Sequence, residues 1–244
     1  MTSSDLWDEE TAARYDASSA GMSAPEVLDP AVDLLARLAG DGPALELAVG
    51  TGRVAVPLAA RGVAVSGIEL SRPMVAELRR KVDEAALPVV VGDMATTRVP
   101  GEFSLVYLVF NTLGNLLTQD EQVACFGNAA RHLRPGGRFV VEIGVPGLRR
   151  LPPGQTAVPF HVDDRYMGVD TYDVATQRGT SHHWSREDDG TVRHGTSSFR
   201  YVWPAELDLM ARLAGLALEN RWADWAGSPF TADSESHVSV WRRP

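Results

Sequence analysis

The segment from Ala44 to Arg53 constrains what this chain can fold into more than any other part of it. Its apolar residues predict a strand, Gly50 and Gly52 predict a turn, and the amphipathic stretch 54–61 predicts a helix. A loop with almost no side chains lets the backbone approach a ligand, and the first N–H groups of the helix point into the same space. The segment therefore predicts a strand–loop–helix unit that binds a ligand.

An acidic residue ends the next apolar run. Residues 63–68 predict a second strand, and Glu69 follows it, seventeen residues after Gly52. A carboxylate at this position can accept hydrogen bonds from both hydroxyls of a ribose. We therefore expect a nucleoside-containing ligand in a crevice at the carboxyl edge of a parallel sheet.

The glycines do not decide which nucleoside binds, because Gly50-x-Gly52-x-x-Ala55 also fits the fingerprint of NAD-binding proteins. Glu46, four residues before Gly50, favours S-adenosylmethionine. A carboxylate repels a pyrophosphate but not an ammonium or a sulfonium group. The structural alternative for Glu46 is a solvated acid at the end of a strand.

Two further strand ends favour the same ligand. Residues 88–92 predict a strand followed by Asp93, which could accept from the adenine amine, and Met94, which could pack on the adenine ring. The structural alternatives are a turn-forming Asp93 and a Met94 that fills the core. The strand predicted at 103–110 is followed by Asn111, which places polar groups where a reacting methyl would lie.

These motifs resemble those of the class I S-adenosylmethionine-dependent methyltransferases over roughly residues 40–143. ELAVGTGR resembles their first motif, GIELS their second, GDM their adenine motif and LRPGGRFVVEI their fifth strand. Ala48 stands where the first glycine usually lies, and we expect ordinary strand dihedrals there, so that it only crowds the ligand by one methyl group. The resemblance implies that the cofactor S-adenosylmethionine is bound by Tyr15, Glu46, Ala48, Gly50, Gly52, Glu69, Leu70, Asp93, Met94 and Phe110.

The N-terminal part of the chain carries a weaker form of the same resemblance. Residues 12–16 resemble the cover segment of many family members, in which a tyrosine, here Tyr15, approaches the cofactor. The alternative is that Trp7 and Tyr15 only attach the N-terminus to the body of the protein.

Strands and helices alternate through much of the chain, which predicts right-handed crossovers and an α/β fold. We expect a doubly wound, mostly parallel seven-stranded sheet that ends in an antiparallel C-terminal hairpin. Strands are predicted at 43–49, 63–69, 88–92, 103–110, 137–143, 217–225 and 237–242, and helices at 29–39 (capped by Asp29), 53–61, 72–86, 118–133 and 204–214. Residues 11–22 are expected to form a short helix and a mobile loop. The expected units are the N-terminal cover and cofactor-binding core (1–143), an inserted β-rich lid (144–203) and the segment that completes the core sheet (204–244).

The inserted segment alternates polar and apolar residues in about four stretches. We expect 161–166 to pair with 168–175, and 180–186 to pair with 192–203 around a turn at 188–190. The segment resembles the antiparallel insertion of small-molecule methyltransferases, which would cover the carboxyl edge as a substrate lid. The predicted catalytic residues are His182, His161, Asn111 and Tyr166, with His183, Trp184, Arg200 and Tyr201 as further acceptor-side candidates. Each histidine could instead be a surface or packing residue.

Methyl transfer is an in-line displacement, and alignment alone can contribute about 7–11 kcal/mol. A general base adds about 10²–10⁴-fold where the acceptor is protonated at neutral pH. We predict an S-adenosylmethionine-dependent methyltransferase that acts on an oxygen or nitrogen of a small-molecule acceptor, such as a secondary metabolite. One alternative is an NAD(P)-dependent oxidoreductase, although the chain lacks an obvious Tyr/Lys relay because Lys81 is its only lysine. The other is a non-catalytic S-adenosylmethionine-binding module.

Composition limits the partners. The net charge of −9 and the pI near 5.1 argue against nucleic acid and anionic membranes as partners. Cys125 is the only cysteine, so no intrachain disulfide can form, and the polar N-terminus does not resemble a signal peptide. These features predict a cytoplasmic protein without a metal site. The aromatic residues near the C-terminus are explained by packing in the core or in a homodimer.

Overall fold

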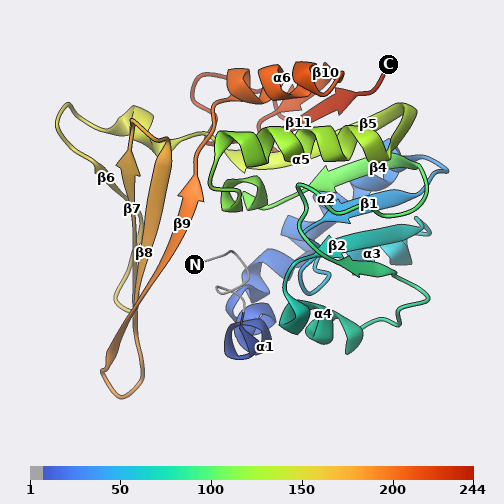
Figure 1. Ribbon diagram of the computed structural model, residues 1–244. Coiled ribbons are helices and arrows are strands. Elements are labelled where there is room, and N and C mark those ends of the chain that lie inside the picture. The colour runs from blue at the N-terminus through green and yellow to red at the C-terminus, as the bar shows by residue number, and fades with distance from the viewer. Residues whose placement is uncertain (1–7) are drawn as a thin grey trace.

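The computed structural model describes residues 8–244, and Trp7 lies outside this range (Figure 1). The larger of its two sheets has the strand order β10-β11-β5-β4-β1-β2-β3. Its strands are β1 (Ala44–Leu47), β2 (Val65–Glu69), β3 (Val89–Val91), β4 (Phe103–Leu108), β5 (Leu133–Gly144), β10 (Ala217–Trp222) and β11 (Ser236–Arg242). The pairs among β1 to β5 are parallel, whereas β11 is antiparallel to both β5 and β10. The predicted seven-stranded sheet with its C-terminal hairpin is confirmed.

Helices cover both faces of this sheet (Figure 1). The two faces are separated by the alternation of side chains along β4. Val106 joins one apolar cluster with Phe126 of α5 (Gln119–His132). Leu105 joins the other with Leu58 of α3 (Ala55–Ala60) and Leu78 of α4 (Arg72–Arg79). The doubly wound arrangement is thereby confirmed. The helices are α1 (Glu9–Ser18), η2 (Ala20–Ser23), α2 (Pro25–Ala39), α3 (Ala55–Ala60), α4 (Arg72–Arg79), η3 (Thr112–Asn115), α5 (Gln119–His132), η4 (Gly147–Arg150) and α6 (Pro204–Leu213).

Local signals set several helix ends. Thr118 accepts from the N–H of Glu121, and the Glu121 side chain accepts from the N–H of Thr118, so the expected capping box starts α5. The predicted cap at Asp29 is wrong, because α2 already begins at Pro25, a residue suited to the first helical position. Asp29 instead forms an ion pair with Arg61 at the end of α3.

The helix predicted over 72–86 is too long. α4 ends at Arg79, whose guanidinium donates to the carbonyls of Val82 and Leu87. These carbonyls belong to the turn that follows, so the side chain at the helix end stabilises an irregular connection to β3. This contact depends on tertiary structure and has no periodic signal in the sequence.

The smaller sheet is the predicted inserted β sheet, and it stands beside the core sheet (Figure 1). Its order is β6-β7-β8-β9, and every neighbouring pair is antiparallel. The strands are β6 (Ala157–Val162), β7 (Tyr166–Asp173), β8 (Arg178–Arg186) and β9 (Val192–Arg200). The expected β8–β9 hairpin is confirmed, with Arg186 opposite Val192. The first hairpin turns at 163–165, several residues earlier than expected, because β6 already begins at Ala157.

None of the helices between residues 8 and 244 combines the length and apolar character needed to cross a bilayer.

Candidate functional site

The glycine loop that follows β1 has a left-handed backbone at alternate positions. Gly50 has φ of +56°, and a Cβ built on it would have no neighbour within 4 Å. Gly52 has φ of +82°, and its Cβ would lie 2.3 Å from Leu78 Cδ1 of α4. Gly50 therefore leaves open space for a ligand, whereas Gly52 allows close contact with a neighbouring helix.

Ala48 also lies in the left-handed region, with φ of +55°. The expectation of ordinary strand dihedrals at this position is wrong. A residue with a Cβ pays roughly 1–2 kcal/mol for this conformation. The left-handed backbone at Ala48 also explains why β1 ends at Leu47 instead of Val49. Ala48 thus stores backbone strain beside the ligand-facing glycine.

Glu69 joins the two strand ends on either side of the predicted crevice. Its Oε2 accepts from the N–H of Gly50 and its Oε1 accepts from the N–H of Ser71, both at 2.8 Å. Burial raises the pKa of Glu69, while the hydrogen bonds from Ser71, Gly50 and Leu70 act in the opposite direction. Each carboxylate oxygen has further acceptor capacity, which two ribose hydroxyls could use.

Glu46 is only 3% exposed, so its interpretation as a solvated strand-end acid is wrong. Tyr107 Oη donates to Glu46 Oε2 at 2.9 Å. Burial raises the pKa of Glu46 to about 8, against the opposing effects of the Tyr107 hydrogen bond and the charge of Arg53. A cation bound beside this carboxyl would stabilise its ionised form, which suits a sulfonium or ammonium ligand.

The third strand end combines turn geometry with core contacts. Asp93 Oδ1 accepts from the N–H of Ala95 at 2.7 Å, as in the turn-forming alternative. Met94 is 8% exposed and belongs to the apolar cluster under α5. Contacts of Asp93 and Met94 with adenine stay predictions, as do those of the half-buried Leu70.

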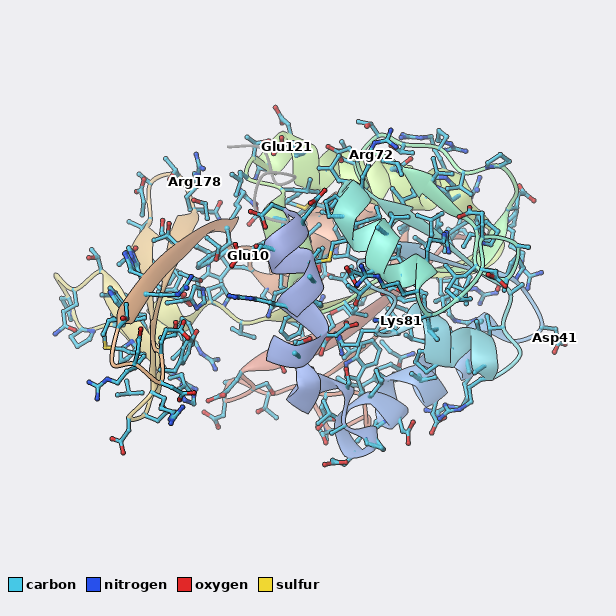
Figure 2. The ribbon with its side chains drawn as sticks, turned by 90° about the horizontal axis from the view of Figure 1, so that it is seen from below. Glu10, Asp41, Arg72, Lys81, Glu121 and Arg178 are labelled. Atoms are coloured by element: carbon cyan, nitrogen blue, oxygen red, sulfur yellow. The ribbon has the colours of Figure 1, made fainter. Side chains whose placement is uncertain are left out.

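The N-terminal helix α1 lies against the glycine loop. Asp16 Oδ1 accepts from Thr51 Oγ1 at 2.6 Å, and Lys81 Nζ donates to the Thr51 carbonyl at 2.9 Å. Lys81 also forms an ion pair with Asp16. Figure 2 shows α1, marked by Glu10, beside the segment that carries Lys81. Burial raises the pKa of Tyr15. The charges of Arg53, Glu46 and Glu69 also act on the Tyr15 hydroxyl. Tyr15 therefore lies near the predicted cofactor residues.

The tip of β4 contains two consecutive left-handed residues, Phe110 and Asn111. Asn111 Oδ1 accepts from the N–H of Gly144 at the end of β5, at 2.6 Å. The guanidinium of Arg53 lies 5.3 Å from the centre of the Phe110 ring. Strained backbone of this kind concentrates at functional sites. This strain also explains why β4 ends at Leu108, two residues before the predicted end.

Glu142, near the end of β5, supports that tip and was missed by the sequence reasoning. Its Oε2 accepts from the N–H of Phe110 at 2.9 Å, and its Oε1 accepts from Trp225 Nε1 at 2.8 Å. The available signal was its position, because it is the acid at the carboxyl end of the run LRPGGRFVVEI.

One face of the inserted sheet gathers titratable side chains. Tyr166 Oη and His183 Nδ1 form a short hydrogen bond across β7 and β8. Burial lowers the pKa of His183, whereas the charge of Asp170 acts in the opposite direction. Asp170 itself accepts from Ser181 Oγ at 2.6 Å and from Tyr172 Oη at 3.3 Å. These groups share a face because strand side chains alternate and Gly168 lies opposite His183.

The same face turns toward the tips of β4 and β5. Phe199, which the β8–β9 register places on this face, has its Cβ 3.6 Å from a Cβ built on Gly114 of η3. Tyr172 Oη lies 3.1 Å from a Cβ built on Gly147, which starts η4. Because η3 follows Asn111 and η4 follows β5, the end of this face that carries Tyr172 and Phe199 adjoins the loops at the carboxyl edge of the core sheet. Tyr166 and His183 lie further along the same face, toward the β8–β9 turn.

The two histidines that were predicted to be catalytic, His182 and His161, do not share the Tyr166 hydrogen bond. His182 occupies the opposite face of β8, where its ring stacks with Trp184 and His194. His161 lies beside the Tyr166 ring, but its Nε2 is 2.7 Å from Asp163 Oδ2, within hydrogen-bond distance. The structure therefore brings Tyr166 together with His183 and separates both from His182.

Cys125 is buried in α5, and burial raises its thiol pKa to about 12, so its expected packing role fits. Within residues 8–244, no group of three or more His, Cys, Asp or Glu side chains is arranged to hold a metal ion.

Comparison with known proteins finds methyltransferases. A family model described as a methyltransferase domain matches residues 44–137. The solved structure of the CcbJ methyltransferase from Streptomyces caelestis shares 41% sequence identity with a TM-score of 0.79, over 88% of each chain. The cypemycin N-terminal methyltransferase of a Streptomyces species is 28% identical over 251 residues, covering 100% of both chains. A dTDP-3-amino-3,4,6-trideoxy-alpha-D-glucopyranose N,N-dimethyltransferase from Streptomyces venezuelae is 36% identical over 98 residues, 40% of each chain.

Proposed function

The chain belongs to the class I S-adenosylmethionine-dependent methyltransferases, and from this premise we propose that it methylates a nitrogen atom of a small-molecule amine. The family assignment separates it from NAD(P)-dependent oxidoreductases, which share only the glycine turn, and from a module that transfers nothing. The choice of nitrogen over oxygen is supported by the names of two relatives, one an N-terminal methyltransferase and one an N,N-dimethyltransferase of an amino sugar.

The residues of the glycine loop fit the cofactor. The open space at Gly50, the buried carboxyl of Glu46 and the spare acceptor capacity of Glu69 suit a cationic nucleoside. When bound, S-adenosylmethionine supplies a methyl group that its sulfonium already activates. In this proposal Glu69 holds the ribose hydroxyls, Asp93 the adenine amine and Glu46 the positive charge, while Tyr15 covers the site from α1.

The observation that supports the acceptor side of the proposal is the Tyr166–His183 pair, on the lid face whose Tyr172–Phe199 end adjoins the loops beyond β4 and β5. An ammonium must lose a proton before its nitrogen can attack a methyl group. In the proposal, Tyr166 passes its hydroxyl proton to His183 Nδ1 while its oxygen takes a proton from the acceptor. Burial lowers the pKa of His183, so the ring is ready to accept, and the charge of Asp170 stabilises the imidazolium that forms.

The proposal also assigns a different role to each of three segments of the chain. Residues 1–143 bind the cofactor, the inserted segment 144–203 encloses the acceptor, and residues 204–244 complete the core sheet. This division is supported by the separate four-stranded sheet that β6 to β9 form. Asn111 at the β4 tip would orient the acceptor, since its Oδ1 is engaged by Gly144 while its amide N–H groups remain potential donors.

An acceptor panel tests the function. The protein is incubated with S-adenosylmethionine and with small amines, namely amino sugars and peptides with a free N-terminus, each beside an analogue in which a hydroxyl replaces the amine. We expect S-adenosylhomocysteine and a mass increase of one methyl group with an amine and not with its hydroxyl analogue. Methylation confined to the hydroxyl compounds would overturn the choice of nitrogen, and turnover with neither class would overturn the proposed acceptor.

A further inference from the structure

Arg200, at the end of β9, is 3% exposed and does not face an acceptor as the sequence suggested. Its guanidinium donates to Gln122 Oε1 at 2.5 Å, to Gln177 Oε1 at 2.8 Å and to Glu206 Oε1 at 2.7 Å. The three partners belong to different segments: Gln122 to α5, Gln177 to the β7–β8 turn and Glu206 to α6. One buried side chain thus links two parts of the lid sheet to two helices of the core.

The partners are also bound to one another. Gln177 Nε2 donates to Glu206 Oε2 at 3.0 Å, and its backbone carbonyl accepts from the N–H of Tyr201. Gln177 has φ of +55°, so the turn adopts an unfavourable left-handed conformation at the residue that makes these contacts. Strain of this kind persists only where surrounding interactions determine it, which indicates that the anchor fixes the turn.

Gln122 extends the network to the β4 tip. Its Nε2 lies within hydrogen-bond distance of the carbonyls of Leu113, Leu116 and Arg200, at 3.2–3.4 Å. Leu113 lies in η3, which begins directly after Asn111. The side chain of Gln122 therefore holds the end of β9 and the loop beyond the β4 tip in a common frame.

This hydrogen-bond network affects how the reacting groups of the lid are aligned with those of the core. A buried guanidinium that loses a partner is left as an uncompensated charge or an unsatisfied donor. Placements of the Arg200 side chain that break its hydrogen bonds are therefore strongly unfavourable. Displacement of a reacting group by about 1 Å can lower a rate by about 10²-fold. The lid contains Tyr166 and His183, whereas the core contains the cofactor loop. The contacts between lid and core therefore determine whether the Tyr166–His183 pair is aligned with the cofactor.

We propose that Arg200 is a positioning residue of the methyl transfer. Together with Gln122 and Gln177, it fixes the angle between the lid sheet and the carboxyl edge of the core, and so holds the Tyr166–His183 pair in line with the methyl donor. The role of that pair rests on the proposed function, but the fixed angle of the lid does not.

Two variants loosen the anchor to different degrees. Arg200→Lys keeps the charge next to Glu206 but loses the planar fork that reaches three acceptors. Gln177→Ala removes one partner from the lid side and leaves the Arg200–Glu206 ion pair, so it keeps the test valid if Arg200→Lys fails to fold. Arg178→Lys is the matched control, because Arg178 lies opposite Arg200 in the β8–β9 register yet is exposed (Figure 2).

The first measurement is independent of the acceptor. Spin labels are attached to Val192→Cys at the tip of the lid and to Asp41→Cys on the far side of the core (Figure 2). Cys125 is fully buried and is not expected to react. Electron–electron double resonance should give one narrow distance distribution for the parent and for Arg178→Lys, and a broadened or displaced one for Arg200→Lys and Gln177→Ala. Equally narrow distributions at the same distance in all four proteins would overturn the proposal.

The second measurement uses an amine identified in the acceptor panel. We expect kcat to fall about 10-fold or more in Arg200→Lys and less in Gln177→Ala, while the affinity for S-adenosylhomocysteine stays within about twofold. A parallel loss of cofactor affinity would contradict a positioning role and indicate general damage. If no amine is methylated, the proposed function fails while the distance measurement still decides whether Arg200 fixes the lid.

Discussion

The backbone N–H of Gly50 donates to the carboxylate of Glu69 at 2.8 Å, so the ligand-facing glycine and the acid at the end of the next strand hold each other in place. The same carboxylate accepts from the N–H of Ser71, which caps α4. Glu69 therefore shapes the glycine loop before any ligand arrives. This dual engagement means that its charge and its hydrogen bonds contribute separately.

Substitution of Glu69 should separate these contributions. Glu69→Ala removes both hydrogen bonds and the ribose acceptor, and we expect the affinity for S-adenosylhomocysteine to fall about 10²-fold, because hydrogen bonds to charged groups contribute about 1.5–3 kcal/mol each. Glu69→Gln keeps one acceptor and should lose less. Isothermal titration calorimetry measures both. Glu102→Ala, on an exposed side chain, is the control, and an unchanged affinity in Glu69→Ala would refute the ribose role.

The buried carboxyl of Glu46 should make stability depend on pH. Its pKa is raised from 4.5 to about 8, so between these values the folded protein retains a proton that the unfolded chain releases. The free energy of unfolding therefore falls as pH rises through this range. Glu46→Gln removes this proton linkage and should be stabilised relative to the parent at pH 8 by a few kcal/mol at most, with about 2–4 °C in Tm for each kcal/mol.

Thermal unfolding at pH 5 and pH 8 measures this effect. The gain of Glu46→Gln over the parent should be larger at pH 8, since Tyr107 can still donate to the amide oxygen of glutamine. Glu102→Gln should show no such difference. A gain that is equal at both pH values would mean that Glu46 titrates normally in the folded protein.

Lys81 should control how fast the cofactor enters and leaves. Lys81→Ala removes the contacts with Asp16 and Thr51, so α1 would separate more readily from the glycine loop. We expect the dissociation rate of S-adenosylhomocysteine to rise several-fold in stopped-flow measurements, with a smaller effect on association. Arg80→Ala, next in the chain and paired with Glu77 on the surface, should behave like the parent. Equal dissociation rates in the two variants would contradict a role for α1 as a cover.

The two adjacent lid histidines should differ in their effect on turnover. His183→Ala removes the partner of Tyr166, and we expect kcat to fall by about 10²–10⁴-fold, the usual contribution of a general base. His182→Ala alters the stack with Trp184 and His194 and a contact with Thr171 on the opposite face, and should cost less than about fivefold. Steady-state kinetics with an amine acceptor measures both, and the reverse order would restore His182 as the acceptor-side residue.

Ala48→Gly should relieve backbone strain. Glycine tolerates the left-handed conformation at position 48, and the relief of roughly 1–2 kcal/mol exceeds the entropic cost of about 0.5–1 kcal/mol for a glycine in the unfolded chain. We expect a net gain of up to about 1.5 kcal/mol in denaturant unfolding. Ala36→Gly inside α2 is the matched control and should lose about 1 kcal/mol. A loss at position 48 as large as that at position 36 would show that the strain is absent.

Much of the architecture could be predicted because it depends on local and periodic signals. Apolar runs located the core strands, the glycine turn located the loop at Gly50, and the capping box at Thr118 located the start of α5. The sequence 188–190 located the β8–β9 turn. Each signal acts within a few residues of the chain, so no knowledge of distant contacts was needed.

Strand and helix ends were predicted less well, because they depend on contacts from elsewhere. β1 and β4 stop where Ala48 and Phe110 turn left-handed, and neither residue type signals that conformation. α4 ends early because the Arg79 side chain donates hydrogen bonds to the carbonyls of Val82 and Leu87 in the next turn. Glu142 could not be identified as the support of the β4 tip until its distance from Phe110 was known.

The sequence by itself determined the α/β fold and the spacing that brings a glycine loop and Glu69 to one sheet edge, because hydrophobic periodicity and the rules of parallel sheets act along the chain. Tertiary structure alone decided which lid histidine meets Tyr166 and that Arg200 is buried as an anchor. The register between β7 and β8 chooses His183 over His182, and a shift by one residue would reverse that choice. Register and burial are set by the packed whole, so no single segment could reveal them.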